Sequence, residues 1–463
     1  MRSGSLVVIL LVALAGSAVP SRAASQTLSP YQRGVPSGSP TAEPLALSMA
    51  DAVRRALEHN LGLILAQERL GEASGARLQA LSELLPNANG RLSASRQKIN
   101  LEAFGFPLPA GFPAVVGPFN VYDARVFVSQ SVFDLRALND ARAEAHNLEA
   151  ARFDVKNARE IVVLVSANAY SHAVATSARL DAARAQMDTA QALARQAADL
   201  KQSGLVAGIE VLRADVQVDT ARQRQTAAQT DFEHAKLQLA RIIGLPPGQA
   251  FTLADPIRES PFPDVTLEQA VERAYQSRGD YLAALERVRA AEASLRAIDG
   301  ELMPSVHVTA DYGGIGLAPS DARATFNVTG AVNVPIFQGG KTRGRRAEAE
   351  ATLRSRRAEA DDVKAGVYYD VQNAFLDLKS GREQLQVATR TRDLAAAQLT
   401  QARDRFAAGV AGNIEVVQAQ ESVALASDQY IGAVFTSNLA AGNVIRALGM
   451  AEEIARQYLG GIR

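Results

Sequence analysis

The stretch ATFNVTGAVNVPIF, residues 324–337, decides how the whole chain folds. Its even-numbered positions from Phe326 to Ile336 are apolar residues or glycine, and its odd-numbered positions from Thr325 to Pro335 are mostly small or polar. This alternation predicts a β-strand with one apolar and one polar face. A strand of about ten residues with two such faces is typical of a transmembrane β-barrel.

The next residues, QGGKTRG (338–344), contain the tripeptide GKT that ends a nucleotide-binding P-loop. A P-loop requires glycine five residues before Gly340, and this chain has Pro335 at that position. Proline has no N–H group, so it cannot contribute to a phosphate-binding backbone loop. We interpret the glycine pair at 339–340 as the turn from a strand into a helix, and we predict no nucleotide site.

The composition narrows the classes of function. The 463 residues include 49 Lys and Arg and 49 Asp and Glu, so the net charge is zero and gives no electrostatic reason to expect nucleic acid as a partner. The chain has no Cys, which excludes disulfides, thiol chemistry and thiolate metal sites. The five His have no metal-ligand spacing, and no nucleophile with a matching base is recognisable. We predict no metal, no cofactor and no enzymatic activity.

The N-terminus has the pattern of a removed secretory signal. Arg2 is followed by the apolar core Leu6–Ala15 and then by small residues, which predicts a signal peptide over 1–23. The apolar core is too short to span a membrane. Residues 24–46 are rich in Ser, Pro and Gly and are predicted to be a disordered leader.

The mature chain contains one pattern twice. LSMADAVRRALEHN begins at Leu47 and VTLEQAVERAYQSR begins at Val265, 218 positions later. SGLVAGIEVLRA at 203–214 matches AGVAGNIEVVQA at 408–419, 205 positions later. The change of offset is explained by the insert at 104–119, FGFPLPAGFPAVVGPF, which the second copy lacks and which we predict to be an extracellular loop. The predicted units are a first repeat, 47–244, a linker, 245–264, a second repeat, 265–449, and a C-terminal tail, 450–463.

Each copy has the same order of predicted elements: a helix, two strands, a very long helix, a glycine-bounded turn and a further helix. At about 1.5 Å per residue, the long helix is roughly 100 Å, and the two shorter helices together have about the same length. The sequence therefore predicts a mainly α protein of long helical hairpins with a small β part. The predicted helices are 48–84, 135–201 and 209–243 in the first copy, and 266–302, 340–406 and 414–448 in the second.

Four strands are too few to close a barrel, because the smallest single-chain barrels have about eight. Three chains would supply about twelve, so membrane insertion predicts an oligomer. The alternative is a soluble pair of β-hairpins that cap a periplasmic coiled-coil scaffold outside any membrane. The sequence leaves both open at this point.

The two-copy layout, together with several motifs in this order, resembles the TolC-type outer-membrane efflux proteins. The motifs are LPN at 85–87, PIFQGG at 335–340 and the paired G…IEV turns. The resemblance implies a homotrimer in which a twelve-stranded β-barrel in outer-membrane lipid continues as an α-barrel through the periplasm. It further implies a passive exit duct for drugs, metals or secreted polypeptides, which docks to a periplasmic adaptor (membrane fusion) protein and an inner-membrane pump of RND or ABC type.

In this family the narrowest ring of the duct lies just after the glycine-bounded turns. The corresponding candidates are Glu210 and Arg213 in the first copy, and Glu415 and Gln418 in the second. The best-known pattern has two acids one turn apart; Glu415 matches the first, but Gln418 replaces the second, which puts a double acidic ring in doubt. Three copies of Glu415 would still favour cations at the entrance. Alternatively, these acids only stabilise helix N-termini.

The same turns carry apolar residues at an exposed end, which favours a protein partner, here the adaptor. The alternative is that they pack within a tight turn of their own. The predicted docking residues are Gly204, Leu205, Val206, Gly208, Gly409, Val410, Ala411 and Gly412.

Overall fold

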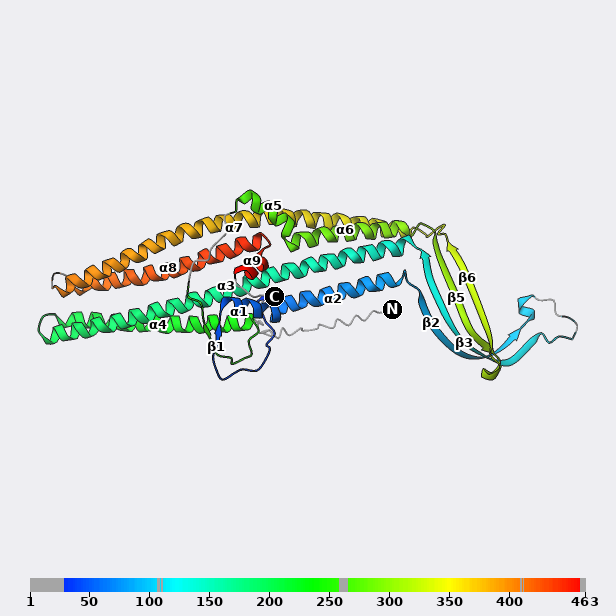
Figure 1. Cartoon of the computed structure of the whole chain (residues 1–463), viewed down its shortest axis with the longest axis horizontal. Coiled ribbons are helices and arrows are strands. Elements are labelled where there is room, and N and C mark those ends of the chain that lie inside the picture. Colours follow the sequence, from blue (N-terminus) through cyan, green and yellow to red (C-terminus); the bar gives the residue numbers. More distant parts are fainter. Residues whose placement is uncertain are drawn as a thin grey trace, which may run out of the picture.

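The protein is an elongated helical rod with a curved β-sheet at one end (Figure 1). The computed structural model describes residues 29–105, 109, 111–257, 265–408, 410 and 412–458. The predicted signal peptide, part of the linker, the tip residues Gly409 and Ala411, and the last five residues lie outside this range.

The same order of elements occurs in both copies. In the first copy they are α1 (Met49–His59), α2 (Leu61–Ser82), β2 (Asn87–Asn100), β3 (Val115–Phe133), α3 (Leu135–Gln202) and α4 (Gly208–Ile242). In the second copy they are α5 (Leu267–Ser277), α6 (Gly279–Gly300), β5 (Ser305–Gly316), β6 (Arg323–Asn333), α7 (Lys341–Ala407) and α8 (Asn413–Ala447). The short elements are η1 (Pro30–Gln32), β1 (Leu45–Leu47), η2 (Glu102–Phe104), β4 (Phe251–Leu253), η3 (Pro319–Asp321) and α9 (Ala451–Tyr458).

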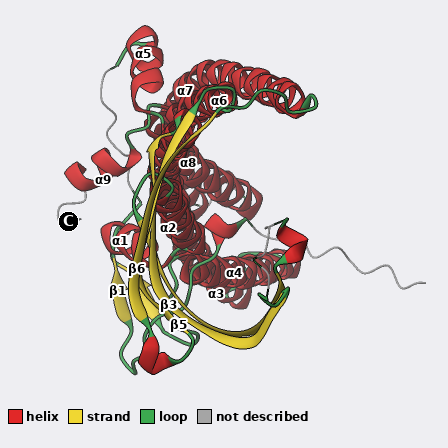
Figure 2. Cartoon of the chain, turned by 90° about the vertical axis from the view of Figure 1, so that its right-hand side faces the viewer, coloured by secondary structure: helices red, strands yellow, loops and turns green. Residues whose placement is uncertain are grey.

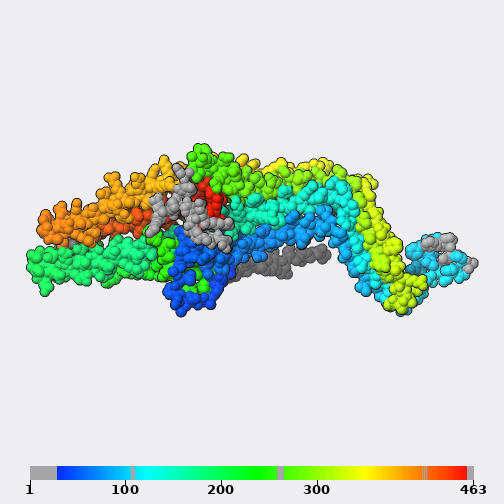
Figure 3. Space-filling model, viewed as in Figure 1, coloured from blue at the N-terminus to red at the C-terminus, as the bar shows by residue number. Residues whose placement is uncertain are grey.

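The predicted bounds of the two long helices, and of the helices that follow them, are confirmed to within one residue. α3 has 68 residues and α7 has 67, and each pairs with the shorter helix that follows it, α4 or α8. The two hairpins form separate ridges toward their tips (Figure 3). One stretch of α3 is apolar enough to cross a membrane by composition, but nearly half of that stretch is buried in the helical core.

The prediction of one continuous helix at the start of each repeat is wrong, because the structure has two consecutive helices there. α1 and α2 meet at Asn60, whose backbone is extended, and α5 and α6 meet at Arg278 in the same conformation. The Asn60 side chain accepts a hydrogen bond from the Gly62 N–H and donates one to the Tyr31 carbonyl. Arg278 instead donates to Asp280 and Asp370. Tertiary partners therefore stabilise both breaks.

The four long strands form one antiparallel sheet in the order β2-β3-β5-β6. The register aligns even-numbered residues with even-numbered residues, so that Val126 pairs with Tyr312, which pairs with Phe326. Each face of the sheet is therefore continuous across the central part of the strands. The sheet is strongly curved when viewed from its end (Figure 2). β2 and β6 are its two edge strands.

The two faces of the sheet differ in chemistry. Exposed apolar side chains cover the even-numbered face, including Leu92 at 87% exposure and Phe326 at 75%. The odd-numbered face carries Arg125, which forms ion pairs with Asp123 at 2.5 Å and Asp311 at 3.0 Å. This confirms the alternation predicted from the sequence. The strand predicted over residues 324–337 is shorter than expected, because β6 ends at Asn333, ahead of Pro335.

The insert at 104–119 is only partly a loop. Its last residues belong to β3, which begins at Val115 and pairs with the end of β2. Residues 106–108 and 110 of the insert lie outside the described range. The insert therefore also lengthens the first hairpin.

The middle of the rod contains the main core, and the predicted leader is part of it. Residues 29–46 were expected to be disordered, but Gly34 donates its N–H to the Arg241 carbonyl at 2.6 Å, and Val35 donates to the His59 carbonyl at 2.7 Å. β1 pairs with β4 in parallel, and Tyr170 is fully buried beside them, where its hydroxyl donates to the Leu47 carbonyl. Part of the leader thus closes the end of α4.

The C-terminal tail is also ordered in part. α9 packs Ala451 and Ala455 against Val53 and Val163 of the first copy. Arg159 of α3 donates two hydrogen bonds of 2.7 Å to Glu452. α9 therefore ties the end of the second copy to the first.

Candidate functional site

The two tips have the same backbone design. Gly204 adopts a left-handed conformation with φ of 73°, which allows the chain to reverse between α3 and α4. The Leu205 N–H then bonds to the Leu200 carbonyl at 2.9 Å. At the other tip, the Val410 N–H bonds to the Arg405 carbonyl at 3.0 Å, 205 positions later. Both turns therefore close the end of a long helix in the same way.

The first tip pairs its acid within one helix. Glu210 lies in the first turn of α4, and its Oε1 accepts a hydrogen bond from Arg213 at 2.7 Å. Its Oε2 is buried and has no partner among the described residues. The charge of Glu210 is thus largely balanced by Arg213, so this pair contributes little net charge to an entrance.

The second tip pairs its acid across the turn. Glu415 in the first turn of α8 lies 3.6 Å from Arg405 near the end of α7. The Gln418 side chain is exposed and has no hydrogen-bond partner in the part of the chain that the structure describes. Glu415 remains 44% exposed, so it is the acid at the tips that is more available to a passing cation.

The tip turns expose large apolar side chains. Leu205 and Val410 are each 72% exposed, whereas Val206 is half-buried. Gly204, Gly208 and Gly412 are exposed and have room around them. The arrangement provides two small apolar knobs, one at each tip.

An apolar groove next to the tips was not predicted from the sequence. It encloses about 340 Å³ between α4 and α8. The spacing Ile209, Leu212 and Val216 on α4, with Ile414 and Val417 on α8, could have revealed it, because residues three and four apart share a helix face. The groove is lined by Ile209, Leu212, Arg213, Val216, Gln217, Ile414 and Val417.

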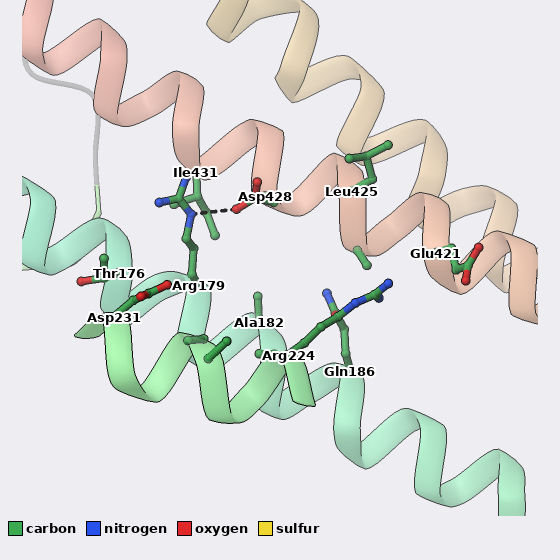
Figure 4. Close-up of a pocket in the computed structure, with 14 residues that line it drawn as sticks. Thr176, Arg179, Ala182, Gln186, Arg224, Asp231, Glu421, Leu425, Asp428 and Ile431 are labelled. Carbon is green, nitrogen blue, oxygen red and sulfur yellow. Dashed lines mark hydrogen bonds and ion pairs between the residues drawn. The ribbon is translucent and has the colours of Figure 1, made fainter. Parts of the chain in front are cut away.

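A second cavity, of about 400 Å³, lies nearer the middle of the rod between α3, α4 and α8 (Figure 4). Arg179 of α3 reaches across it to Asp428 of α8 at 2.7 Å. Arg224 and Glu421 also line the cavity, and neither has a partner among the described residues. The Arg179–Asp428 ion pair therefore joins the helical hairpins of the first and second repeat within one chain, between the tips and the middle of the rod.

The described residues contain no group of three or more His, Asp or Glu that could hold a metal ion. The candidate functional features are instead structural and electrostatic: a two-faced curved sheet, two long hairpins and charged tips.

This combination is the fold of an outer-membrane channel with a periplasmic helical part. The structure of the Campylobacter jejuni CmeC outer membrane channel has the same fold, with a TM-score of 0.75 at 18% identity over 87% of this chain and 86% of CmeC. The family model of the outer membrane efflux proteins matches residues 52–245 and 270–449. The chain belongs to the outer membrane efflux protein family.

Curated relatives agree with this assignment. The chain is 23% identical over 397 residues to the pyoverdine export outer membrane protein OpmQ of Pseudomonas putida, which covers 84% of this chain and 82% of OpmQ. It is 27% identical over 265 residues to the outer membrane efflux protein BepC of Brucella suis, over 56% of this chain and 53% of BepC. The chain thus matches about half the length of BepC. It is an outer-membrane protein whose helical part lies in the periplasm.

Proposed function

We propose that three copies of this chain form a passive exit duct. In this proposal, three four-stranded sheets close into a twelve-stranded barrel, and the helical hairpins continue it as a tunnel of about 100 Å. The observation that carries the proposal is the open sheet. Its edge strands β2 and β6 have 14 and 11 residues, and long edges of this kind invite pairing with another chain.

The exposed face of the sheet supports membrane insertion. In hydrocarbon every backbone polar group must be paired, which a closed barrel achieves and an open sheet does not. The even-numbered face would contact lipid, and the odd-numbered face, with Arg125 and its two aspartates, would line the lumen. The competing scaffold would leave large side chains such as Phe326 and Val328 in water.

The tips favour a protein partner on the periplasmic side. The exposed Leu205 and Val410 fit a periplasmic adaptor that connects the duct to an inner-membrane pump of RND or ABC type. In this proposal the duct itself is passive, and the pump would supply the energy for export. The cargo class is small molecules, such as drugs and metals, or secreted polypeptides.

We further propose that three copies of Glu415 form a ring at the periplasmic entrance, with Gln418 one turn further along α8. The partial exposure of Glu415 and its long ion pair with Arg405 support this assignment. Glu210 and Arg213 would contribute less, because they neutralise each other.

Single-channel conductance in a planar bilayer tests the duct. The experiment compares purified mature protein with Glu415→Gln, and Glu210→Gln serves as the matched control at the other tip. We expect channels from trimeric material, and a lower preference for cations with Glu415→Gln only. Folded protein that gives no channels would favour the periplasmic scaffold, and channels unaffected by Glu415→Gln would reduce Glu415 to a helix-end role.

A further inference from the structure

The odd-numbered face of the sheet carries a cluster of charged and aromatic side chains, at the opposite end of the rod from the tips (Figure 1). In the proposed duct this face lines the lumen of the barrel. We propose that the cluster binds aromatic carboxylates as they pass through the barrel. This binding site rests on the proposed duct and gives the duct a class of cargo. The cluster consists of Arg91 of β2, Asp123, Arg125 and Phe127 of β3, and Asp311 of β5.

Two arginines stand opposite each other at the centre of the cluster. Arg91 of β2 pairs with Arg125 of β3 in the antiparallel register, so both side chains lie on the odd-numbered face. Like charges directly opposite each other on neighbouring strands destabilise a sheet. A cluster with a purely structural role would therefore have a carboxylate partner for each arginine, and this cluster provides such partners for only one of them.

Arg125 is neutralised and held in place. Its Nε and Nη2 donate to the two carboxylate oxygens of Asp123 at 2.8 and 2.5 Å, and its Nη1 donates to Asp311 at 3.0 Å. Gly313 of β5 lies opposite Arg125, and a Cβ atom there would stand 2.8 Å from the Arg125 Cγ and 2.1 Å from the Ala124 carbonyl oxygen. Glycine at this position therefore leaves the space that the Arg125 side chain needs to reach Asp311.

The acids of the cluster are covered more than its cations. The side chains of Asp123 and Asp311 are 14% and 11% exposed, whereas that of Arg125 is 26% exposed and Arg91 is exposed as well. The surface that faces the lumen in the proposed duct is therefore formed by guanidinium groups, with the carboxylates beneath them.

Arg91 is oriented by a ring rather than by an acid. Its guanidinium carbon lies over the Phe127 ring, 5.4 Å from the ring centre, and the guanidinium carbon of Arg125 lies 5.2 Å from the same centre. A cation–π contact positions a guanidinium without neutralising its charge. Arg91 has no ion-pair partner in the part of the chain that the structure describes. Its N–H donors are thus available to an acceptor from outside the chain.

The whole face has an excess of positive charge. Among its paired residues, three arginines (91, 125 and 323) and two aspartates (123 and 311) are the only Arg, Lys, Asp or Glu, which gives a net charge of +1 per chain. Arg323 of β6 is exposed and, like Arg91, has no ion-pair partner among the described residues. Three copies around one lumen would raise the local concentration of anions there.

The exposed groups define the class of cargo. A carboxylate accepts two parallel hydrogen bonds from the planar fork of an arginine, and a flat ring stacks on a guanidinium plane or packs against Phe127. An inorganic anion would use only the guanidinium, a neutral ring would leave its donors unused, and an amine would be repelled. The site is also opposite in sign to the ring proposed at Glu415, so probes of different charge separate the two ends of the duct.

Calorimetry tests the site. The mature protein in a nonionic detergent is titrated with 1-naphthoate, and with 1-naphthylmethylamine as the probe of opposite charge. We expect Arg91→Gln to weaken binding of 1-naphthoate about tenfold or more, because it removes a charge-assisted pair of hydrogen bonds. Arg91→Lys keeps the charge but loses the planar fork and should fall between the two. Phe127→Leu should also weaken 1-naphthoate, because it removes the ring.

Arg96→Gln is the matched control. Arg96 is another exposed arginine of β2 without an ion-pair partner among the described residues, but it lies on the even-numbered face. We expect this variant to bind 1-naphthoate as wild type does. Equal losses from Arg91→Gln and Arg96→Gln would overturn the site, because they would show a general effect of net charge.

Thermal stability distinguishes binding from a structural role for Arg91. Arg91→Gln removes one of two like charges that face each other across β2 and β3, so we expect its melting temperature to equal or exceed that of wild type. A lower melting temperature together with unchanged binding of 1-naphthoate would overturn the site and make Arg91 a structural residue.

Planar bilayers connect the site to the duct. We expect 1-naphthoate to reduce the single-channel current of wild type and of Glu415→Gln, and to have little effect on Arg91→Gln. Channels that 1-naphthoate affects equally with and without Arg91 would overturn the site but leave the duct intact. Wild-type protein that forms neither oligomers nor channels would instead overturn the proposed function.

Discussion

α2 and α6 are equivalent helices of the two copies, but their surroundings differ. α6 is packed between α3 and α7, and its charged residues have partners on both: Glu286 bonds to His146 at 2.7 Å, and Glu292 bonds to Arg357 at 2.8 Å. α2 packs on α3 along its length and on η1 only at its first turn, where Tyr31 lies against Gly62. Its side chains Glu68 and Glu72 have no partner among the described residues.

The difference is consistent with the proposed duct. Within one chain, α6 is covered by helices on two sides, whereas one side of α2 is exposed. In the proposed duct, a neighbouring copy of the chain would cover that side of α2. The sheet also has uncovered edges, since β3 and β5 are paired with strands on both sides, whereas β2 and β6 are paired on one side only.

The largest expected effect comes from placing a charge in the contact between α6 and α3. Ala293 is fully buried in α6, so Ala293→Glu would bury an unpaired carboxylate and should cost about 3 kcal/mol or more of the free energy of unfolding. Gly75→Glu, the equivalent change in α2, should leave the fold of the single chain intact. Thermal unfolding followed by circular dichroism in detergent measures the first effect.

The same substitutions should differ in their effect on assembly. Gly75 lies on the exposed side of α2, which a neighbouring copy would cover in the proposed duct, so Gly75→Glu should weaken oligomers, whereas Gly75→Ala should be tolerated. Equal assembly of the Glu and Ala variants would contradict the idea that another chain covers this side of α2. Equal thermal stability of Ala293→Glu and Gly75→Glu would contradict the difference between the two helices.

Much of the fold follows from the sequence because its elements are long. A helix of 68 residues repeats its period many times, and glycines or prolines mark its ends. The breaks at Asn60 and Arg278 were missed, since neither residue is a helix breaker. Each break depends on a partner remote in sequence, the Tyr31 carbonyl or Asp370. The ordered leader was missed for the same reason, because its partners exist only after α4 has folded.

The pairing of the charged tip residues could also be predicted from the sequence only in part. The Glu210–Arg213 pair follows from their spacing of three on one helix. The Glu415–Arg405 pair joins two helices across a turn, and no helical period predicts it. Sequence placed these residues near one another, but only the fold determines which charges are balanced.

The second largest effect compares the two helix junctions. Arg278 is 5% exposed and donates to Asp280 and Asp370, so Arg278→Ala should cost about 2–3 kcal/mol of the free energy of unfolding. Asn60→Ala removes a helix cap and the bond to the leader, and should cost about 1–2 kcal/mol. Chemical unfolding of both variants under the same conditions provides the measurement. A larger cost for Asn60→Ala would show that the leader matters more than the charged junction.

A smaller, pH-dependent effect is expected at Asp280. Burial acts to raise the pKa of its carboxyl, but the hydrogen bond from Arg278 prevails and lowers this pKa below the usual value of 3.8. Asp280 therefore contributes stability that is present above about pH 4 and is lost as the pH falls through the lowered pKa. Asp280→Asn should cost about 1–2 kcal/mol at pH 7, and the difference from wild type should shrink below pH 4.

Glu160 of the first repeat should have the opposite effect on how stability depends on pH. Burial raises the pKa of its carboxyl, despite the N–H donors of Ala451 and Glu452. As the pH rises from its ordinary value of 4.5 toward the raised pKa, wild type should lose stability relative to Glu160→Gln. Unfolding curves of wild type, Asp280→Asn and Glu160→Gln, recorded between pH 3 and 8, measure the pH dependence of the free energy of unfolding. Parallel pH trends for Asp280→Asn and Glu160→Gln would contradict this interpretation.

The smallest effect on stability, but a distinct effect on function, is expected at the tips. Arg405→Gln and Arg213→Gln each remove an ion pair near the surface, although Glu210 is the more buried acid, and should change the free energy of unfolding by less than about 1 kcal/mol. Arg405→Gln frees Glu415 and should raise the cation preference of the channel, whereas Glu415→Gln should lower it. If Glu415 faces the lumen, the double variant should resemble Glu415→Gln alone, because Arg405 acts through that carboxylate. An effect of Arg405→Gln that persists without Glu415 would place the guanidinium itself at the entrance, and a larger shift from Arg213→Gln would move the selective ring to the first copy.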